Sequence, residues 1–166
     1  MKKINIVLVE PEIPQNTGNI SRTCACTDCS LHLVKPMKFS IEDRYLKRAG
    51  LDYWPYLDLK VHESLDEFLK FSEGSPLICA STKASNTYSD ITYPDGCFIL
   101  FGKETAGLPE PLLKKYYNNC IRIPMKDTLR SLNLSNSVAI IVYEALRQKN
   151  FEGLKKAGKL RNDDIL

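Results

Sequence analysis

Short apolar runs alternate along this chain with segments whose apolar residues recur at helical spacing. The runs are rich in β-branched residues and nearly continuous, as at residues 4–9. Runs of this kind are typical of strands buried on both faces of a sheet. We therefore predict strands at residues 4–9, 31–34, 57–61, 77–80, 97–101 and 120–123.

Helical patterns separate the predicted strands, over about 18–29, 41–49, 64–71, 109–117 and 137–149. Ser64 and Glu67 have the spacing of a capping box at the start of the third helix. Gly50 stands where a C-cap glycine ends the second, and Asn136 is a candidate N-cap of the last. Repeated alternation of strand and helix predicts an α/β fold, with a mainly parallel sheet covered by helices on both faces.

The length and composition predict one domain. The chain has 166 residues, of which 43% are hydrophobic and 26% charged, as in an ordinary globular domain. Residues 1–150 are expected to form this domain, and 151–166, which are poor in apolar residues, a loosely ordered C-terminal tail. No apolar run reaches the roughly 20 residues of a membrane span, and the N-terminal run is too short for a signal peptide. We expect a cytoplasmic protein without a membrane partner.

The last predicted helix carries more apolar surface than one neighbour can cover. Five residues at helical spacing form a single stripe: Val138, Ile141, Val142, Ala145 and Leu146. Ala139, Ile140 and Tyr143 extend the apolar surface beyond it. Dimer packing would cover this surface, and burial within one subunit is the alternative.

Charge and cysteine content narrow the chemistry only slightly. A net charge of +3 is compatible with an RNA partner but does not argue for one. Cys24, Cys26 and Cys29 are closely spaced and His32 is nearby, but a structural zinc site needs four converging ligands. We therefore expect no metal, and six cysteines that serve as buried packing. His62 has no evident catalytic partner and is expected on the surface of a strand.

Three segments rich in Gly, Asn and Ser follow predicted strands, at residues 14–22, 101–109 and 123–136. In an open parallel sheet, ligands gather outside the carboxyl ends of the strands. Taken singly, the polar residues of these segments could be helix caps, turn glycines or solvated charges. The chain has no Walker loop and no serine-centred elbow.

Taken together, the three segments resemble the SPOUT class of RNA methyltransferases, and within it the tRNA (cytidine/uridine-34)-2′-O-methyltransferases of the TrmL (YibK) type. The resemblance covers roughly residues 4–148, with a further match at 48–53. The motif residues include Asn16, Gly18 and Arg22, then Gly102, Glu104 and Gly107, then Arg130, Ser131 and Asn133. It implies a SPOUT fold with a C-terminal trefoil knot, a homodimer with Tyr143 near the interface, and a tRNA substrate.

The resemblance also implies S-adenosylmethionine as the cofactor, giving S-adenosylhomocysteine as the product. The residues that it places against the cofactor are Ala80, Gly102, Ile123, Ser131 and Leu132. A glycine at 102 would let the backbone approach the nucleoside closely. Ala80 and Ile123 would act through backbone groups, and plain core packing at two strand ends is the alternative reading for both.

Arg22 holds the position of the family's catalytic arginine. A guanidinium keeps its proton far above neutral pH, so we expect Arg22 to donate hydrogen bonds to the ribose oxygen or an adjacent phosphate rather than act as a base. Asn16 and Glu104 are expected to hold Arg22 and the loops, and Asn133 with Ser131 to position the hydroxyl. The alternatives are a helix cap for Asn16 and a surface carboxylate for Glu104.

The chain departs from the family pattern at Lys103 and Ala106, where relatives commonly have Pro and Arg. Lys103 could contact RNA phosphate. Arg44, Lys47 and Arg48 form a basic helix face that could meet tRNA or be solvated. Two other functions stay open: 2′-O-methylation of ribosomal RNA or of another tRNA position, and a non-catalytic RNA-binding module on the same fold.

Overall fold

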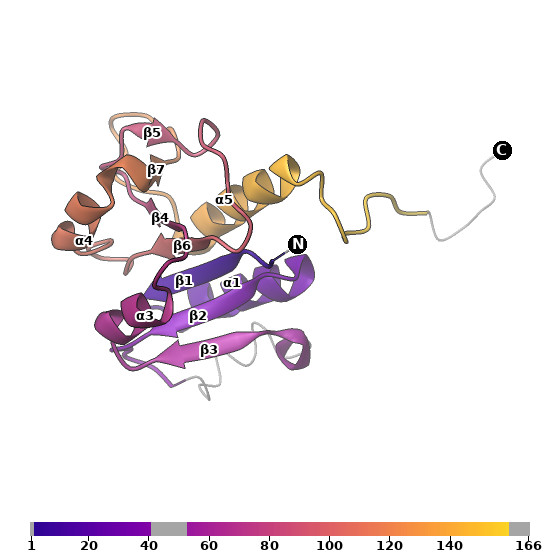
Figure 1. The fold of residues 1–166 in the computed structure, drawn as a ribbon, viewed down its shortest axis with the longest axis horizontal. Helices are drawn as coiled ribbons and strands as arrows, with labels where there is room; N and C mark the ends of the chain where they lie inside the picture. Colours follow the sequence, from indigo (N-terminus) through magenta and orange to yellow (C-terminus); the bar gives the residue numbers. More distant parts are fainter. Residues whose placement is uncertain (1, 41–52, 160–166) are drawn as a thin grey trace.

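The computed structural model describes residues 2–40 and 53–159, and its centre is a parallel sheet. In the described part of the chain the sheet has seven strands in the order β3-β2-β1-β6-β4-β7-β5, visible from bottom to top in Figure 1. Every strand pair is parallel. The strands are β1 (Asn5–Val9), β2 (Ser30–Val34), β3 (Leu59–His62), β4 (Leu77–Ala80), β5 (Asn86–Thr87), β6 (Phe98–Phe101) and β7 (Cys120–Arg122). The predicted α/β fold is confirmed.

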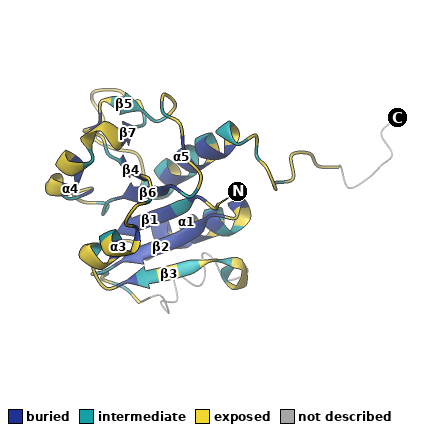
Figure 2. Cartoon of the chain, in the orientation of Figure 1, coloured by how far each residue is buried: buried dark blue, intermediate teal, exposed yellow. Residues whose placement is uncertain are grey.

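Helices cover both faces of this sheet. They are α1 (Pro14–Thr27), α3 (Leu65–Phe71), α4 (Glu110–Lys115) and α5 (Leu134–Gln148), with 3-10 turns η1 (Trp54–Tyr56) and η2 (Tyr117–Asn119). Side chains of β1 alternate between the faces: Ile6 and Leu8 pack with α1 and α5, whereas Val7 and Val9 lie in the cluster with α3 and α4. Figure 2 shows the resulting buried centre, with exposed residues on the outer sides of the helices.

Several boundaries differ from the prediction. Helix α1 begins at Pro14, whose missing N–H costs nothing at a first helical position, rather than at Gly18. Helix α5 begins at Leu134, and Asn133 is its N-cap, so the assignment of that role to Asn136 was wrong. Strand β5 was not predicted. The predicted helix over 41–49 lies outside the described residues, as do Arg44, Lys47 and Arg48.

The chain after α5 runs away from the sheet (Figure 1). Phe151 and Leu154 are partly buried against the core, while residues 155–159 are exposed. The division into a domain over 1–150 and a tail over 151–166 stays a prediction. None of the helices within residues 2–40 and 53–159 is long and apolar enough to cross a membrane.

Five of the six cysteines are buried, as expected, but Cys26 is exposed, so the expectation was wrong for that residue. Wherever the structure describes the chain, no group of three or more His, Cys, Asp or Glu side chains could hold a metal ion. The buried cysteines contribute to packing: Cys24 and Cys29 belong to the core cluster that includes α1 and α5, and Cys79 and Cys120 to the opposite one.

The expectation that His62 lies on the surface was wrong. Its side chain is buried, and its Nε2 lies 2.9 Å from Nδ1 of His32 on the neighbouring strand. The two rings stack at 5.3 Å, and Phe68 of α3 packs edge-on against both. Burial followed by the nearby His62 lowers the pKa of His32 to about 4, and burial also lowers the pKa of His62.

The stability of the fold should therefore fall between pH 6.5 and 4. Over this range the unfolded chain binds protons at His32 that the folded chain does not, so stability is full above pH 6.5 and is lost as the pH falls. We expect a loss of about 1–2 kcal/mol between pH 7 and 5 from His32. Urea unfolding at a series of pH values measures it. A His32→Leu, His62→Leu variant should show a shallower slope, and an unchanged slope would contradict the assignment.

Candidate active site

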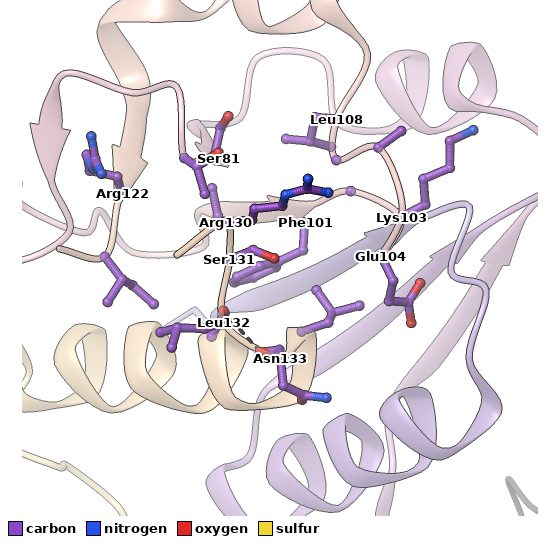
Figure 3. A pocket seen from close by; sticks show the side chains of 18 of the residues that line it. Ser81, Phe101, Lys103, Glu104, Leu108, Arg122, Arg130, Ser131, Leu132 and Asn133 are labelled. Carbon is purple, nitrogen blue, oxygen red and sulfur yellow. Dashed lines mark hydrogen bonds between the residues drawn. The ribbon is translucent and has the colours of Figure 1, made fainter. Parts of the chain in front are cut away.

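A pocket of about 630 Å³ lies at the carboxyl ends of β4, β6 and β7. All three segments identified in the sequence contribute to its walls. Among the residues expected at the site, those that line the pocket are Ala80, Gly102, Ile123, Ser131, Leu132, Asn16, Glu104 and Asn133. Figure 3 shows Ser131, Leu132 and Asn133 on the loop before α5, with Glu104 and Lys103 on the facing loop. Arg22 is not among the lining residues.

The Glu104 carboxylate joins the second segment to the first. It accepts hydrogen bonds from the backbone N–H groups of Glu12 (2.8 Å) and Ile13 (3.2 Å), and from Nδ2 of Asn16 (3.0 Å). Helix α1 has no side-chain cap from its own N-cap residue, Ile13. A carboxylate at this end of the helix also interacts favourably with the helix dipole. Glu104 thus caps a helix that begins some 90 residues earlier in the chain.

Glu12, in the first loop, accepts hydrogen bonds from the second loop in turn. Its carboxylate accepts from the backbone N–H (3.0 Å) and from Oγ1 (2.7 Å) of Thr105. These hydrogen bonds, the side-chain one first, lower the pKa of Glu12 and keep it ionised. Glu12 was not among the residues predicted for the site, although it is an acidic residue within the first motif. The two loops therefore hold one another through reciprocal carboxylates.

Lys103 has a partner within the same pair of loops. Its Nζ lies 2.7 Å from Oε2 of Glu10, and both side chains are partly buried. This hydrogen bond raises the pKa of Lys103. In this ion pair, the Glu10 carboxylate neutralises the positive charge of Lys103 that would otherwise attract an RNA phosphate. The idea that Lys103 grips RNA stays a prediction and gains no support here.

Asn16 and Asn133 connect the first segment to the third. Nδ2 of Asn133 donates to Oδ1 of Asn16 at 3.0 Å. Oδ1 of Asn133 accepts from the backbone N–H groups of Ser135 (2.9 Å) and Asn136 (3.3 Å), and so caps α5. A continuous network therefore runs from Glu104 through Asn16 and Asn133 to the start of α5. We call it the Glu104–Asn16–Asn133 network.

The conformation of the second segment explains Gly102. A Cβ atom at this residue would lie 1.9 Å from the backbone carbonyl carbon of Gly107 and 2.1 Å from the backbone nitrogen of Leu108. The loop closes on itself there, with the N–H of Gly107 donating to the carbonyl of Lys103 at 2.8 Å. Gly102 is thus required by its own loop, in addition to any close approach of a ligand.

Arg22 lies apart from this network in the single chain. It is exposed on α1, and its Cζ lies 4.8 Å from the centroid of the Tyr53 ring. In the described part of the chain, Asn16 and Glu104 hold the loops but make no hydrogen bond to Arg22. The predicted grip on Arg22 by these two residues is therefore absent within one subunit.

The chain matches a known protein family, curated proteins and solved structures. The model of the SpoU rRNA Methylase family matches residues 3–143. A protein of Listeria monocytogenes serotype 4b (strain F2365) is 56% identical over 153 residues, which is 90% of each chain. The tRNA (cytidine(34)-2′-O)-methyltransferase of Methylovorus glucosotrophus (strain SIP3-4) is 48% identical over 150 residues, covering 90% of this chain and 97% of that protein.

Solved structures of methyltransferases are also similar to this chain. One described as giving structural insights into the 2-OH methylation of C/U34 on tRNA has a TM-score of 0.86 and 40% identity, covering 90% of this chain and 97% of the other. The methyltransferase AviRb from Streptomyces viridochromogenes, in complex with the cofactor AdoMet, has a TM-score of 0.81 at 23% identity, with 90% and 58% covered, and supports the fold alone. From the match to the family model and from these identities, the chain belongs to the SpoU rRNA Methylase family.

Proposed function

We propose that this chain acts in the cytoplasm and methylates the ribose 2′-hydroxyl of the nucleotide at position 34 of tRNA, a cytidine or a uridine. The proposal is supported by the tRNA (cytidine(34)-2′-O)-methyltransferase of Methylovorus glucosotrophus, which is 48% identical to this chain over nearly its whole length. The observation on this chain that carries it is the Glu104–Asn16–Asn133 network, because the network brings three distant segments to one pocket.

The methyl donor in this proposal is S-adenosylmethionine, the cofactor that membership of this methylase family and the resemblance of the three segments imply. When bound, it supplies the methyl group as an electrophilic carbon on a positively charged sulfur. The pocket suits such a molecule, since its volume of about 630 Å³ is that of a typical small-molecule site and its walls mix apolar with polar groups. The residues proposed to hold it are Ala80, Gly102, Ile123, Ser131 and Leu132.

The proposed enzyme is a homodimer in which a second copy brings Arg22 to the pocket. Three features support this arrangement. Arg22 lies outside its own subunit's pocket, and Tyr143 of α5 is 51% exposed although the apolar stripe of the same helix is buried within the subunit. Ile13, at the start of α1 and on the pocket wall, is 41% exposed. An interface over α1 and α5 would cover both apolar side chains.

The chemistry then depends mainly on positioning and on hydrogen bonding. A 2′-hydroxyl becomes a better nucleophile as its proton leaves, and groups that stabilise the developing negative charge lower the barrier. The Arg22 guanidinium keeps its proton and donates to the ribose oxygen or to an adjacent phosphate. Asn16, Glu104 and Asn133 keep the pocket loops in place, which holds the reacting groups in line.

The C-terminal trefoil knot implied by the resemblance stays part of this proposal. The strand order is compatible with it, because β7 is inserted between β4 and β5. The chain then returns in α5 to pack with α1 on the core shared by both helices.

The function is tested with purified protein, S-adenosylmethionine and unmodified tRNA. Nuclease digestion and mass spectrometry should locate one ribose methyl group at position 34. A matched tRNA with a 2′-deoxynucleotide at that position should accept none. Sedimentation of the same preparation should give a dimer.

Other outcomes would favour other readings. Methylation elsewhere in tRNA, or of ribosomal RNA in a parallel reaction, would replace the position-34 assignment. Cofactor binding without transfer to either RNA would indicate a non-catalytic RNA-binding module.

A further inference from the structure

Tyr53, to which no role has been assigned above, lies beside Arg22. Tyr53 lies immediately before η1 and is half-buried, and its ring centroid is 4.8 Å from Cζ of Arg22. A cation within about 6 Å of an aromatic face is attracted by the negative face of the ring. The contact joins η1, on the way to β3, to the outer side of α1.

This contact holds the arginine without occupying its hydrogen-bond donors. Within the described chain, Arg22 has no carboxylate within 4 Å. Arg147 shows the contrast, since its Nε and Nη2 both donate to Glu144 at 2.8 and 2.9 Å. A guanidinium held by a carboxylate has fewer N–H groups left for a substrate. One held against a ring keeps them available.

An exposed arginine otherwise samples many rotamers, and ordering it at the moment of reaction opposes catalysis. A side chain that is already ordered loses less freedom when it meets its target. We propose that Tyr53 is a positioning residue, which orients the Arg22 guanidinium for the ribose oxygen or phosphate. This inference rests on the proposed function, in which Arg22 acts on the substrate.

The test compares three single variants in the methylation of tRNA. Tyr53→Leu removes the aromatic face and should lower kcat about 3- to 5-fold, without changing the KM for S-adenosylmethionine. Tyr53→Phe keeps the face and should restore most of the rate. Tyr56→Leu is the matched control, because Tyr56 is 79% exposed on the same turn and should leave the rate unchanged.

A double variant separates positioning from a structural effect. In an Arg22→Ala background, Tyr53→Leu should cause no further loss of rate. An equal loss in both backgrounds would overturn the proposal, as would a Tyr53→Phe variant as slow as Tyr53→Leu.

A second measurement does not depend on activity. In protein labelled with ¹⁵N-arginine, the Nε proton of Arg22 should show a ring-current shift in the wild type and in Tyr53→Phe, and lose it in Tyr53→Leu. If this shift is seen but no RNA is methylated, the proposed function fails while the contact stands. If the shift is missing from the wild type, the positioning role itself is wrong.

Discussion

The Gly102→Ala variant should bind S-adenosylhomocysteine about 100-fold more weakly than the wild type, or about 2.7 kcal/mol. The added Cβ would lie 1.9 Å from the backbone of Gly107, so the whole turn from Gly102 to Leu108 must move. Overpacking of this kind typically costs about 1–3 kcal/mol. The same movement would displace Glu104 from the start of α1. Titration calorimetry measures the affinity, and thermal unfolding the stability.

Gly158→Ala is the control for this prediction. Nothing lies within 4 Å of a Cβ at that residue, so both affinity and stability should match the wild type. If Gly102→Ala bound the ligand normally, the pocket beside this turn would not be the cofactor site.

The Arg22→Ala variant should lower kcat by about 10²–10³-fold, as does the loss of one donor to a developing oxyanion in other enzymes. Its affinity for S-adenosylhomocysteine should not change, because Arg22 is proposed to donate to the ribose oxygen or phosphate of the tRNA rather than to the cofactor. Single-turnover methylation of tRNA separates the chemical step from binding.

Arg22→Lys distinguishes a forked donor from a simple positive charge. Lysine keeps the charge but lacks the planar pair of N–H groups, so most of the loss should remain. A lysine variant that works at the wild-type rate would contradict the bidentate role. A change in cofactor affinity with either substitution would place Arg22 nearer the cofactor than we propose.

The main strands were predictable because their positions follow from the local pattern of apolar residues. Strands buried on both faces must be apolar at nearly every position, and β1, β4 and β6 read that way in the sequence. Strand β5 could not be found in this manner. It consists of Asn86 and Thr87, which pair with β7 and are only half-buried, so no apolar run marks it.

Helix starts were less predictable where the cap comes from elsewhere in the chain. Glu104 accepts from the backbone N–H groups of Glu12 and Ile13, just before α1, and a local reading of the sequence cannot detect this contact. Pro14 was the available local signal. At α5, both Asn133 and Asn136 could be N-caps by residue type, and the choice depends on the contact of Asn133 with Asn16.

The candidate site was predicted as a set of residues but not as an arrangement. Resemblance to a family identified Asn16, Glu104 and Asn133, and these three do meet. The reciprocal role of Glu12 depends on the backbone of Thr105, and backbone donors carry no signal in sequence. His62 was misplaced for a similar reason, since its burial comes from Phe68 on a helix packed across the strands.

The Glu104–Asn16–Asn133 network has a consequence for anyone who redesigns this protein. Each amide in it serves two loops at once, so a loop exchanged alone would leave an unmatched donor or acceptor in the other two. Grafting a new specificity should therefore transplant the three side chains as one unit, together with the backbone turns that present them.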